Sequence, residues 1–496
     1  MAENILALDI GTQSVRASVL SAGGDILGIA QVGHEVDSPH PGWAQQRPDE
    51  WWDETRRAIR EVLSDTGAAA DSIAAIGACG QMHGPVGLDE QGAVTTEWVQ
   101  LWCDKRCRTQ VEAVREQHDD ARLARIAGSS INPAWTGLKV RWHKDNAREV
   151  YERSRWFLVP KDFINYRLTG VAAADPSEAS GSFLWDCETD CYSQDLATAV
   201  DVDLAKFAPA HPSHEVIGSV TKAAAELTGL RQGTPVVAGG GDFPVSMLGF
   251  GIVGEGVTAD VTGTSTLLAA HSAKPLVDPA IQNLRHAVDG WIPFTILDCG
   301  GLSMKWCKDI VGAIRGEDVS YDELITIASE APAGSDGLLF YPYMLGERRR
   351  ENTTSRGGYF GIRLNHSAPH FVRAVMEGVA LAMGKDVATL RKLGLEVDRI
   401  LSVGGGTRNE PWNQIKANIT GVPLDLSEEP EAGLKGAALL AAAGVGLIDD
   451  PARVAVERRA STRTVEPDPQ TVEAYGEARK EFIRVYDHML GFWLEK

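Results

Sequence analysis

Short apolar runs alternate with glycine-containing polar turns at the start of the chain. This pattern predicts an antiparallel meander of three strands, over residues 5–10, 15–20 and 26–30. Apolar residues at helical intervals then predict a helix over residues 49–63, and a further strand follows over residues 73–79. This succession of strands and helix indicates an α/β fold.

A similar pattern returns past the middle of the chain. Residues 234–238 predict a strand that ends in Gly-Gly-Gly-Asp, and residues 257–270 predict a hairpin. Asp9 and Asp260 each end a predicted strand and precede a turn that contains Gly-Thr. We therefore predict two related domains that face each other across a boundary near residues 245–256. The predicted domains are residues 1–248 and 249–496.

Further elements are predicted in the second half. Apolar residues on one face predict a long helix over residues 369–393, and residues 399–403 predict a strand that runs into three glycines. Asn409 stands at the start of the next helix, and a terminal helix lies within residues 467–496. Residues 436–448 are apolar but too short to span a bilayer, so they predict a buried helix.

Length and charge narrow the possible functions. The 496 residues exceed what one hydrophobic core usually supports, which agrees with two domains. Acidic residues number 68 against 48 basic ones, and the net charge of −20 argues against nucleic acid and anionic membranes as partners. We therefore expect a small-molecule partner. The start of the chain lacks the basic flank and cleavage site of a secretory signal, so we expect a cytoplasmic protein.

The seven cysteines are scattered along the chain, and their number is odd. This distribution argues against a disulfide framework, so reduced thiols are expected. Cys103, Cys107, Cys187 and Cys191 could in principle bind zinc, but their spacing is not that of a structural zinc site. Small apolar core residues are the better interpretation.

Three glycine-rich turns follow predicted strands in the two halves of the chain. Backbone amides in such turns are unhindered by side chains and can approach phosphate oxygens closely. The turns are Gly11-Thr12-Gln13-Ser14, Gly263-Thr264-Ser265 and Gly404-Gly405-Gly406. Each alone is consistent with an ordinary tight turn. Together they indicate a site for the phosphates of a nucleotide.

Acidic residues near the predicted strand ends offer two kinds of chemistry. Asp9 could hold a hydrated Mg²⁺ that bridges nucleotide phosphates, with Arg16 neutralising another oxygen, or Asp9 could cap the turn. Asp242 could take the proton of an attacking hydroxyl, or it could cap a helix that begins at Phe243 and Pro244. The residues alone leave both choices open.

Residues 81–84 and 101–104 follow two further predicted strands and carry amide, imidazole, indole and carboxylate groups. A sugar site needs such a mixture, because a sugar has apolar C–H faces and hydroxyls that need directional partners. A lone histidine such as His83 is more often structural. The two segments are therefore candidates for a sugar pocket.

Taken together, these motifs resemble the FGGY family of carbohydrate kinases, within the superfamily of actin-like and hexokinase-like ATPases. The resemblance extends over nearly the whole chain, from Asn4 to the terminal helix. Its landmarks in this sequence are Asp9-Ile10-Gly11-Thr12, Gly80-Gln81-Met82-His83-Gly84, Pro160-Lys161-Asp162-Phe163, Val236-Val237-Ala238-Gly239-Gly240-Gly241-Asp242, Tyr341-Pro342-Tyr343-Met344-Leu345-Gly346-Glu347-Arg348, Phe360-Gly361-Ile362 and Val403-Gly404-Gly405-Gly406-Thr407-Arg408-Asn409.

The resemblance implies two ribonuclease-H-like domains that flank a catalytic cleft, with the sugar on the side of the first domain and ATP on the side of the second. It implies that Asp242 is the general base and that Asp9 lies near Mg²⁺. The positions that match ATP-binding residues are Gly11, Thr12, Gln13, Arg16, Gly263, Thr264, Gly405 and Asn409, with Gly301 as a weaker match. The positions that match the sugar pocket are Met82, His83, Trp102 and Asp242, with Asp104 and Arg106 bracing it.

The implied reaction is ATP-dependent phosphorylation of a primary hydroxyl of a ketopentose, with D-xylulose as the first candidate. Another ketose or polyol, of the ribulose, erythrulose or erythritol type, stays open as the substrate. The motifs also leave open a non-catalytic sugar sensor and an actin-like or chaperone-like ATPase. Members of the family are often dimers, so a homodimer is expected. Closure of the domains on the sugar, with a hinge over residues 245–256, would exclude water.

Three positions depart from the pattern of family members that act on xylulose. Phe243 replaces the Asn that usually follows the catalytic Asp, and Cys103 also stands where Asn is usual. Arg348-Arg349-Arg350 replaces a Thr-Pro continuation. Without the amide, a buried substrate hydroxyl lacks a partner, which costs about 1–3 kcal/mol. We therefore expect altered substrate contacts.

Overall fold

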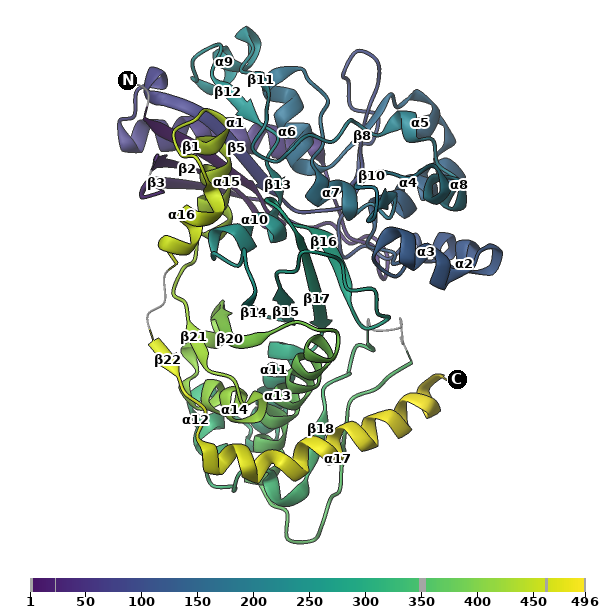
Figure 1. Ribbon diagram of the computed structural model, residues 1–496, viewed down its shortest axis with the longest axis vertical. Helices are drawn as coiled ribbons and strands as arrows, with labels where there is room; N and C mark the ends of the chain where they lie inside the picture. Colours follow the sequence, from purple (N-terminus) through teal and green to yellow (C-terminus); the bar gives the residue numbers. More distant parts are fainter. Residues whose placement is uncertain (1–2, 23, 348–353, 460–462, 495–496) are drawn as a thin grey trace.

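The computed structural model describes residues 3–22, 24–347, 354–459 and 463–494. These residues form two α/β lobes, each with a seven-stranded sheet at its centre (Figure 1). The first lobe carries the start of the chain, and the second carries the long terminal helix. Within the described ranges, no helix combines the length and apolarity that crossing a membrane requires.

The first sheet is built around the predicted meander. Its strands are β1 (Asn4–Ile10), β2 (Ser14–Ser21), β3 (Ile26–Gly33), β5 (Ile73–Gly80), β11 (Val216–Ser219), β12 (Pro235–Val237) and β13 (Gly240–Gly241). The order is β11-β12-β5-β1-β2-β3, and β13 pairs with β5. β1, β2 and β3 pair antiparallel in sequence, and β5 lies parallel to β1. The strands predicted over residues 5–30 and 73–79 are confirmed.

The second sheet repeats this pairing. Its strands are β14 (Gly256–Thr262), β15 (Thr266–Ala270), β16 (Gln282–Arg285), β17 (Trp291–Leu297), β20 (Val397–Val403), β21 (Leu424–Leu426) and β22 (Arg463–Val465). β14, β15 and β17 pair antiparallel, as β1, β2 and β3 do. β20 lies parallel to β14, as β5 lies parallel to β1. The two lobes are thus two related copies, as the sequence pattern predicted, and their arrangement is the ribonuclease-H-like one that the family resemblance implied.

Helices cover both sheets. α1 (Pro48–Thr66) begins with proline in its first turn and ends at Gly67, whose φ of +65° suits glycine. The other helices of the first half are α2 (Arg108–Gln117), α3 (Asp120–Ala127), α4 (Thr136–Asn146), α5 (Arg148–Arg153), α6 (Pro160–Thr169), α7 (Pro176–Ser180), α8 (Gln194–Val200), α9 (Lys222–Thr228) and α10 (Asp242–Gly249). Those of the second half are α11 (Gly300–Arg315), α12 (Tyr321–Ser329), α13 (Ala368–Lys392), α14 (Glu410–Thr420), α15 (Ala432–Gly444), α16 (Pro451–Glu457) and α17 (Pro469–Leu494). The long helix predicted over residues 369–393 is α13.

Short strands complete the fold outside the two main sheets. They are β4 (Gln45–Gln46), β6 (Val86–Leu88), β7 (Val99–Gln100), β8 (Trp156–Leu158), β9 (Trp185–Asp186), β10 (Cys191–Tyr192), β18 (Leu339–Tyr341) and β19 (Gly358–Phe360). The β4–β7 and β6–β8 pairs belong to the first half of the chain.

Helix α15 crosses from the second half of the chain to the first lobe. It packs on β1 and β5, and in Figure 1 it lies beside them. The fit is close, because a Cβ on Gly77 would lie 2.2 Å from the carbonyl oxygen of Ala437. The predicted buried helix is therefore present. The predicted domain boundary after residue 248 assigns α15 to the second domain, although α15 packs on the sheet of the first lobe.

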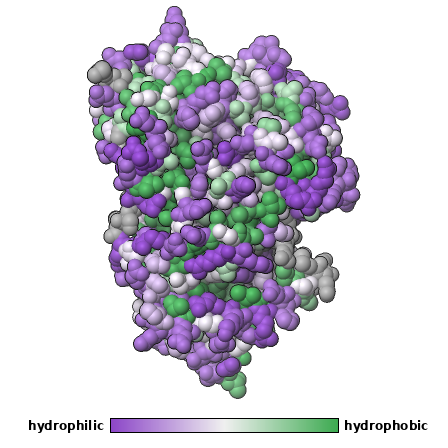
Figure 2. Space-filling view, in the orientation of Figure 1, coloured by the Kyte–Doolittle hydropathy of each residue, from purple (hydrophilic) through white to green (hydrophobic). Residues whose placement is uncertain are grey.

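The lobes meet at a waist. α10 ends at Gly249 and β14 begins at Gly256, so the chain passes between the sheets within the predicted boundary of 245–256. Figure 2 shows a group of hydrophobic side chains at this waist on the face drawn. Two of the cavities described next are lined by residues from both halves of the chain.

Candidate active site

A cavity of about 740 Å³ in the second lobe brings together the residues that the sequence assigned to the nucleotide there. Its lining includes Gly263, Thr264, Gly301, Gly405 and Asn409. They come from the β14–β15 turn, the start of α11, the turn after β20 and the start of α14. Gly301, the weaker match to the family, therefore also lines this cavity.

Close backbone packing explains one glycine at this site. A Cβ on Gly301 would lie 2.0 Å from the carbonyl oxygen of Gly263, so a larger residue would push the two walls apart. Asn409 caps α14, since its Oδ1 accepts from the backbone N–H of Trp412 at 3.0 Å. Tyr321 and Trp412 also line the cavity. The sequence analysis missed both, because aromatic residues within helices usually indicate core packing.

A second cavity, of about 230 Å³, lies between the lobes and contains all four residues predicted for the sugar. Met82 and His83 follow β5, Trp102 follows β7, and Asp242 begins α10. The second lobe closes the other side. Its lining residues include Ser265, Leu267, Gln282, Leu284, Phe294 and Ile296.

Asp242 begins helix α10 at the edge of the sugar cavity. The sequence left open whether it is a base or a helix cap. The structure places it at the first position of α10, where its Oδ1 accepts from the backbone N–H of Phe243 at 2.7 Å. Burial, and then the negative charge of Asp9, raise the pKa of Asp242 to about 7, against the opposing effects of the Phe243 amide and Arg16. Such a carboxylate is matched to general-base chemistry near neutral pH.

Asp9 lies at the end of β1, behind the same cleft, and its two oxygens differ. Oδ2 pairs with Nη2 of Arg16, while Oδ1 is buried and has no hydrogen-bond partner among the described residues. The other arm of Arg16 lies 2.6 Å from Oε2 of Glu431, so Arg16 faces two carboxylates. Burial, together with the charges of Asp9 and Asp242, raises the pKa of the Cys79 thiol well above its ordinary value. Cys79 is therefore neutral between them.

Asp9 is suited to a hard divalent cation. An unpartnered carboxylate oxygen is a ligand that Mg²⁺ prefers, and this ion commonly uses one or two carboxylates with phosphate oxygens and water. The described part of the chain has no group of three or more His, Cys, Asp or Glu side chains that could hold a metal. A metal here would therefore depend on the nucleotide as well as on Asp9.

The first phosphate turn is tied to the sugar cavity through side chains. Nε1 of Trp102 donates to Oγ1 of Thr12 at 3.1 Å, and Thr12 donates to Oε1 of Gln81 at 3.3 Å. The Gly11 amide is occupied, since it donates to the carbonyl of Ser14 at 3.0 Å. Gln13 is exposed. Gly11, Thr12, Gln13 and Arg16 are not among the lining residues of the nucleotide cavity, so their contact with phosphate stays a prediction.

His83 is held in a strained and neutral state. Its φ is +72°, a conformation that residues with a side chain rarely adopt. Burial, and then the charge of Lys139, lower the pKa of His83 to about 3, so its ring is uncharged near neutral pH. Its Nδ1 is buried without a partner within the described residues. The neutral ring of His83 lines the sugar cavity.

Lys139 is a positioning group that the sequence analysis missed. It lies inside α4, fully buried, and its Nζ donates to the carbonyl of Leu101 at 2.7 Å and to that of His83 at 3.3 Å. It therefore joins the two loops that carry the sugar candidates. Asp104 and Arg106 brace the same region, because they form a buried pair at 2.7 Å. Nothing local in the sequence distinguishes Lys139 from an exposed helical lysine.

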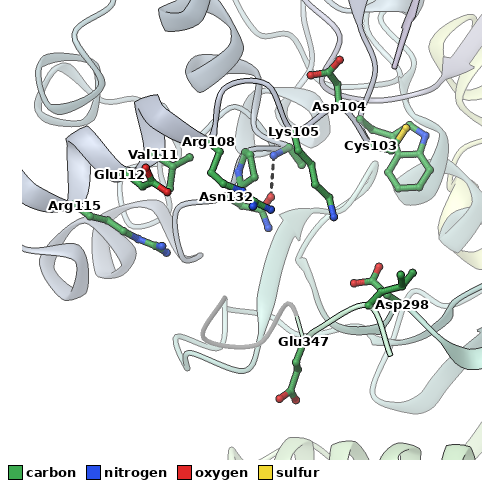
Figure 3. Close-up of a pocket in the computed structure, with 14 residues that line it drawn as sticks. Cys103, Asp104, Lys105, Arg108, Val111, Glu112, Arg115, Asn132, Asp298 and Glu347 are labelled. Carbon is green, nitrogen blue, oxygen red and sulfur yellow. Dashed lines mark hydrogen bonds between the residues drawn. The ribbon is translucent and has the colours of Figure 1, made fainter. Parts of the chain in front are cut away.

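A third cavity, of about 270 Å³, adjoins the sugar cavity and shares Trp102, Asn132 and Ala134 with it. Figure 3 shows Lys105 pointing into this cavity, and Asp298 on the wall that the second half of the chain provides.

The three positions that depart from the xylulose pattern have different places in the structure. Cys103 lines the third cavity and not the sugar cavity. Phe243 lines the sugar cavity and packs edge-on against Phe294, with ring centroids 5.3 Å apart. Arg348, Arg349 and Arg350 lie outside the described residues. Phe243 is therefore the departure that reaches the sugar candidates.

Comparisons with known proteins agree with this geometry. The family model described as "FGGY family of carbohydrate kinases, N-terminal domain" matches residues 4–249, and the model of the C-terminal domain matches residues 259–445. The xylulose kinase of Bacillus subtilis is 28% identical over 488 residues, which cover 98% of this chain and 97% of that protein. The autoinducer-2 kinase of Escherichia coli O139:H28 is 27% identical over 520 aligned positions, which cover 98% of this chain and 94% of that protein.

The crystal structure of xylulose kinase from Rhodospirillum rubrum superimposes with a TM-score of 0.91 at 29% identity, over 99% of each chain. The fold is thus that of a two-domain sugar kinase throughout its length. Both lobes and the cleft between them are accounted for by one family. The chain belongs to the FGGY family of carbohydrate kinases and is itself a carbohydrate kinase.

Proposed function

We propose that this kinase phosphorylates a primary hydroxyl of a ketopentose, at the expense of ATP, with D-xylulose as the first substrate to test. The observation that carries the proposal is the position of Asp242. It borders a sugar-sized cavity between the lobes, and its pKa of about 7 suits a general base. The relatives named xylulose kinase, at 28 and 29% identity, support the choice of sugar.

The base acts at the sugar. Asp242 accepts the hydroxyl proton as the oxygen attacks the γ-phosphoryl group, and the Phe243 amide fixes one carboxylate oxygen so that the other is available. His83 and Trp102 orient the substrate from the same wall. Transfer of a phosphoryl group depends on such positioning more than on covalent chemistry.

Charge at the phosphates is balanced from both lobes. Asp9 would hold Mg²⁺ through its unpartnered oxygen, and the bound ion would neutralise charge on the transferred phosphoryl group. The turns that contain Thr12 and Thr264 supply backbone amides, and Arg16 supplies positive charge. Because Arg16 pairs with Asp9 and Glu431 in this structure, it must loosen one of these contacts to meet a phosphate.

The substrate could also be another ketose or a polyol. Phe243 and Phe294 make one wall of the sugar cavity apolar at a point where an amide is usual among xylulose kinases. The autoinducer-2 kinase relative shows that proteins this similar carry different substrate names. A sugar sensor is less well supported, because both Asp9 and Asp242 are present. A protein-binding ATPase leaves the sugar cavity unexplained.

A coupled assay of ADP release over pentuloses, tetruloses and polyols tests the proposal. We expect sugar-dependent ADP release, fastest with a ketopentose, and its loss in Asp242→Asn with Mg·ATP binding retained. ADP release that does not depend on any sugar would contradict the proposal. A polyol or tetrulose as the best substrate would replace D-xylulose and leave the kinase mechanism in place. The cytoplasmic location and the homodimer are further parts of the proposal, and gel filtration with light scattering tests the latter.

A further inference from the structure

The turn that carries Asp242 has no side chains with which to hold itself in place. Residues 239–241 are glycines, and side chains would collide there. A Cβ on Gly239 would lie 2.0 Å from the carbonyl oxygen of Ala78, and one on Gly241 would lie 2.7 Å from Sδ of Met82. A run of glycines is the most flexible kind of backbone. The position of Asp242 therefore depends on contacts from outside the turn, which are the pairing of Gly240 and Gly241 with β5 and the side-chain contacts described next.

Buried side chains hold both ends of this turn. The carbonyl oxygen of Ala238 accepts hydrogen bonds from Nζ of Lys161 and Nδ2 of Asn165, both at 2.9 Å. The N–H of Gly241, directly before Asp242, donates to Oγ of Ser177 at 3.0 Å. Lys161, Asn165 and Ser177 are all buried. None of the three lines the sugar cavity, so they reach the base only through the backbone.

Asp175 connects the two ends. Its Oδ1 lies 2.8 Å from Nζ of Lys161, and its Oδ2 accepts the hydroxyl hydrogen of Ser177 at 2.5 Å. A serine hydroxyl has a single hydrogen, so donation to Asp175 leaves the lone pairs of Ser177 for the N–H of Gly241. Oδ2 also accepts from the backbone N–H of Ser177 and from Oγ of Ser213, at 2.8 and 3.2 Å. The carboxylate is thus fixed, and it fixes the direction of the hydroxyl.

We propose that Ser177, oriented by Asp175, is a positioning residue that holds Asp242 in the geometry needed for proton transfer. This inference rests on the proposed function, because it needs Asp242 to be the base. A displacement of about 1 Å at a reacting group can cost about 10²-fold in rate. Loss of the hydrogen bond at Gly241 therefore lowers kcat, while the walls that bind sugar and nucleotide stay intact.

The test compares Ser177→Ala with a matched control. We expect Ser177→Ala to lower kcat by about tenfold or more, with the KM values for ketose and ATP within about twofold of the wild type. Ser182→Ala is the control, because Ser182 is also buried, and its hydroxyl donates to the carbonyl oxygen of Ala179 at 2.5 Å and accepts from the N–H of Leu184 at 3.0 Å. Its kinetic constants should stay those of the wild type. A merely structural role for Ser177 would not separate kcat from KM in this way.

A second variant covers the case in which Ser177→Ala does not fold. Ser177→Cys keeps the volume of the buried site, but a thiol is a weak hydrogen-bond acceptor. It should also lower kcat at unchanged KM. Hydrogen exchange of the peptide that contains Gly241 should be faster in both variants, because its amide has lost a good acceptor.

The outcomes separate this inference from the proposed function. Wild-type kcat in both Ser177 variants, or a raised KM with kcat unchanged, would overturn the positioning role. An equal loss of kcat in Ser182→Ala would also overturn it. If the wild type is active, Asp242→Asn is inactive and the Ser177 variants are unaffected, only this inference fails. If the wild type shows no sugar-dependent ADP release, the proposed function fails and the role of Ser177 falls with it.

Discussion

The two lobes place a carboxylate at the same point of the same hairpin and treat it differently. Asp9 lies one residue before the end of β1, opposite Cys79 of β5, and Asp260 occupies the matching point of β14, opposite Ser402 of β20. Asp260 is completely buried. Its Oδ2 accepts from Nζ of Lys416 at 2.7 Å and from Ser402 at 2.9 Å, and its Oδ1 accepts from Thr262 at 2.5 Å.

Asp9 is left incomplete by comparison. Only its Oδ2 pairs with a cation, Arg16, and its Oδ1 has no hydrogen-bond partner within the described residues. Where the second lobe offers the hydroxyl of Ser402, the first offers the thiol of Cys79, which is a weak donor. A buried carboxylate with every oxygen satisfied supports the fold, whereas one with an open oxygen can take a ligand. The two lobes therefore share the position of the aspartate, and the side chains around each aspartate decide whether it supports the fold or can take a ligand.

The largest expected effect is on stability, in the second lobe. Asp260→Asn leaves the ammonium of Lys416 buried without its counter-charge, which costs about 3–5 kcal/mol of the free energy of unfolding. Urea unfolding of the variant measures this. The double variant Asp260→Asn with Lys416→Met removes both charges and should recover most of the loss. Unchanged stability in the single variant would show that Asp260 is not the structural member of the pair.

In the first lobe, the matching substitution of Asp9 should reduce activity and leave stability nearly unchanged. Asp9→Asn should lower kcat by about 10²–10³-fold, because it removes the charge that would hold the metal at the phosphates. Its free energy of unfolding should change little, since Arg16 keeps its contact with Glu431. Parallel kinetic and unfolding measurements on this variant and on Asp260→Asn are required. A stability loss in Asp9→Asn as large as that in Asp260→Asn would erase the distinction between the lobes.

This contrast marks the limit of what the sequence could predict. The strands, the main helices and the two related halves were predictable, because apolar runs and glycine turns follow local rules. Asp9 and Asp260 look alike locally. What separates them is Lys416, which is far along the chain from Asp260 and is recognisable only once α14 lies against β14. The sequence had no signal for that pairing.

The candidate site divides in the same way. The turns that contain Gly263 and Gly405 could be found as short motifs, the family resemblance assigned these glycines and Asn409 to the nucleotide, and all three line one cavity. Lys139 and Ser177 could not, since each is an ordinary residue within a helix until its backbone partner is known. Local sequence patterns therefore do not predict residues whose role depends on a hydrogen bond to a distant segment of the chain.

The two lobes also meet at the cavity proposed for the sugar, through the contact of Phe243 with Phe294. Phe243→Asn places an amide beside the proposed base and should raise kcat/KM for D-xylulose by about tenfold, since a matched substrate hydroxyl is worth about 1–3 kcal/mol. Phe243→Leu keeps the wall apolar and should not produce this gain. Steady-state kinetics over the sugar panel measure both variants. Identical substrate profiles for the two would mean that the first lobe does not set the choice of sugar at this position.

The smallest effect is the influence of Asp9 on Asp242. The proposed role of Asp242 as the base requires its ionised form, so kcat/KM should rise with pH and level off above about 7. Asp9→Asn removes one of the two causes of the raised pKa of Asp242, so the rise of its residual activity with pH should move to lower pH. Asp260→Asn should leave the pH of this rise unchanged.

Stability should change with pH in the opposite sense. The folded protein holds the proton of Asp242 to a higher pH than the unfolded chain does, so the free energy of unfolding should fall between about pH 4 and pH 7. Asp242→Asn should remove this fall in the free energy of unfolding. If the activity of Asp9→Asn still rises near pH 7, burial alone sets the pKa of Asp242.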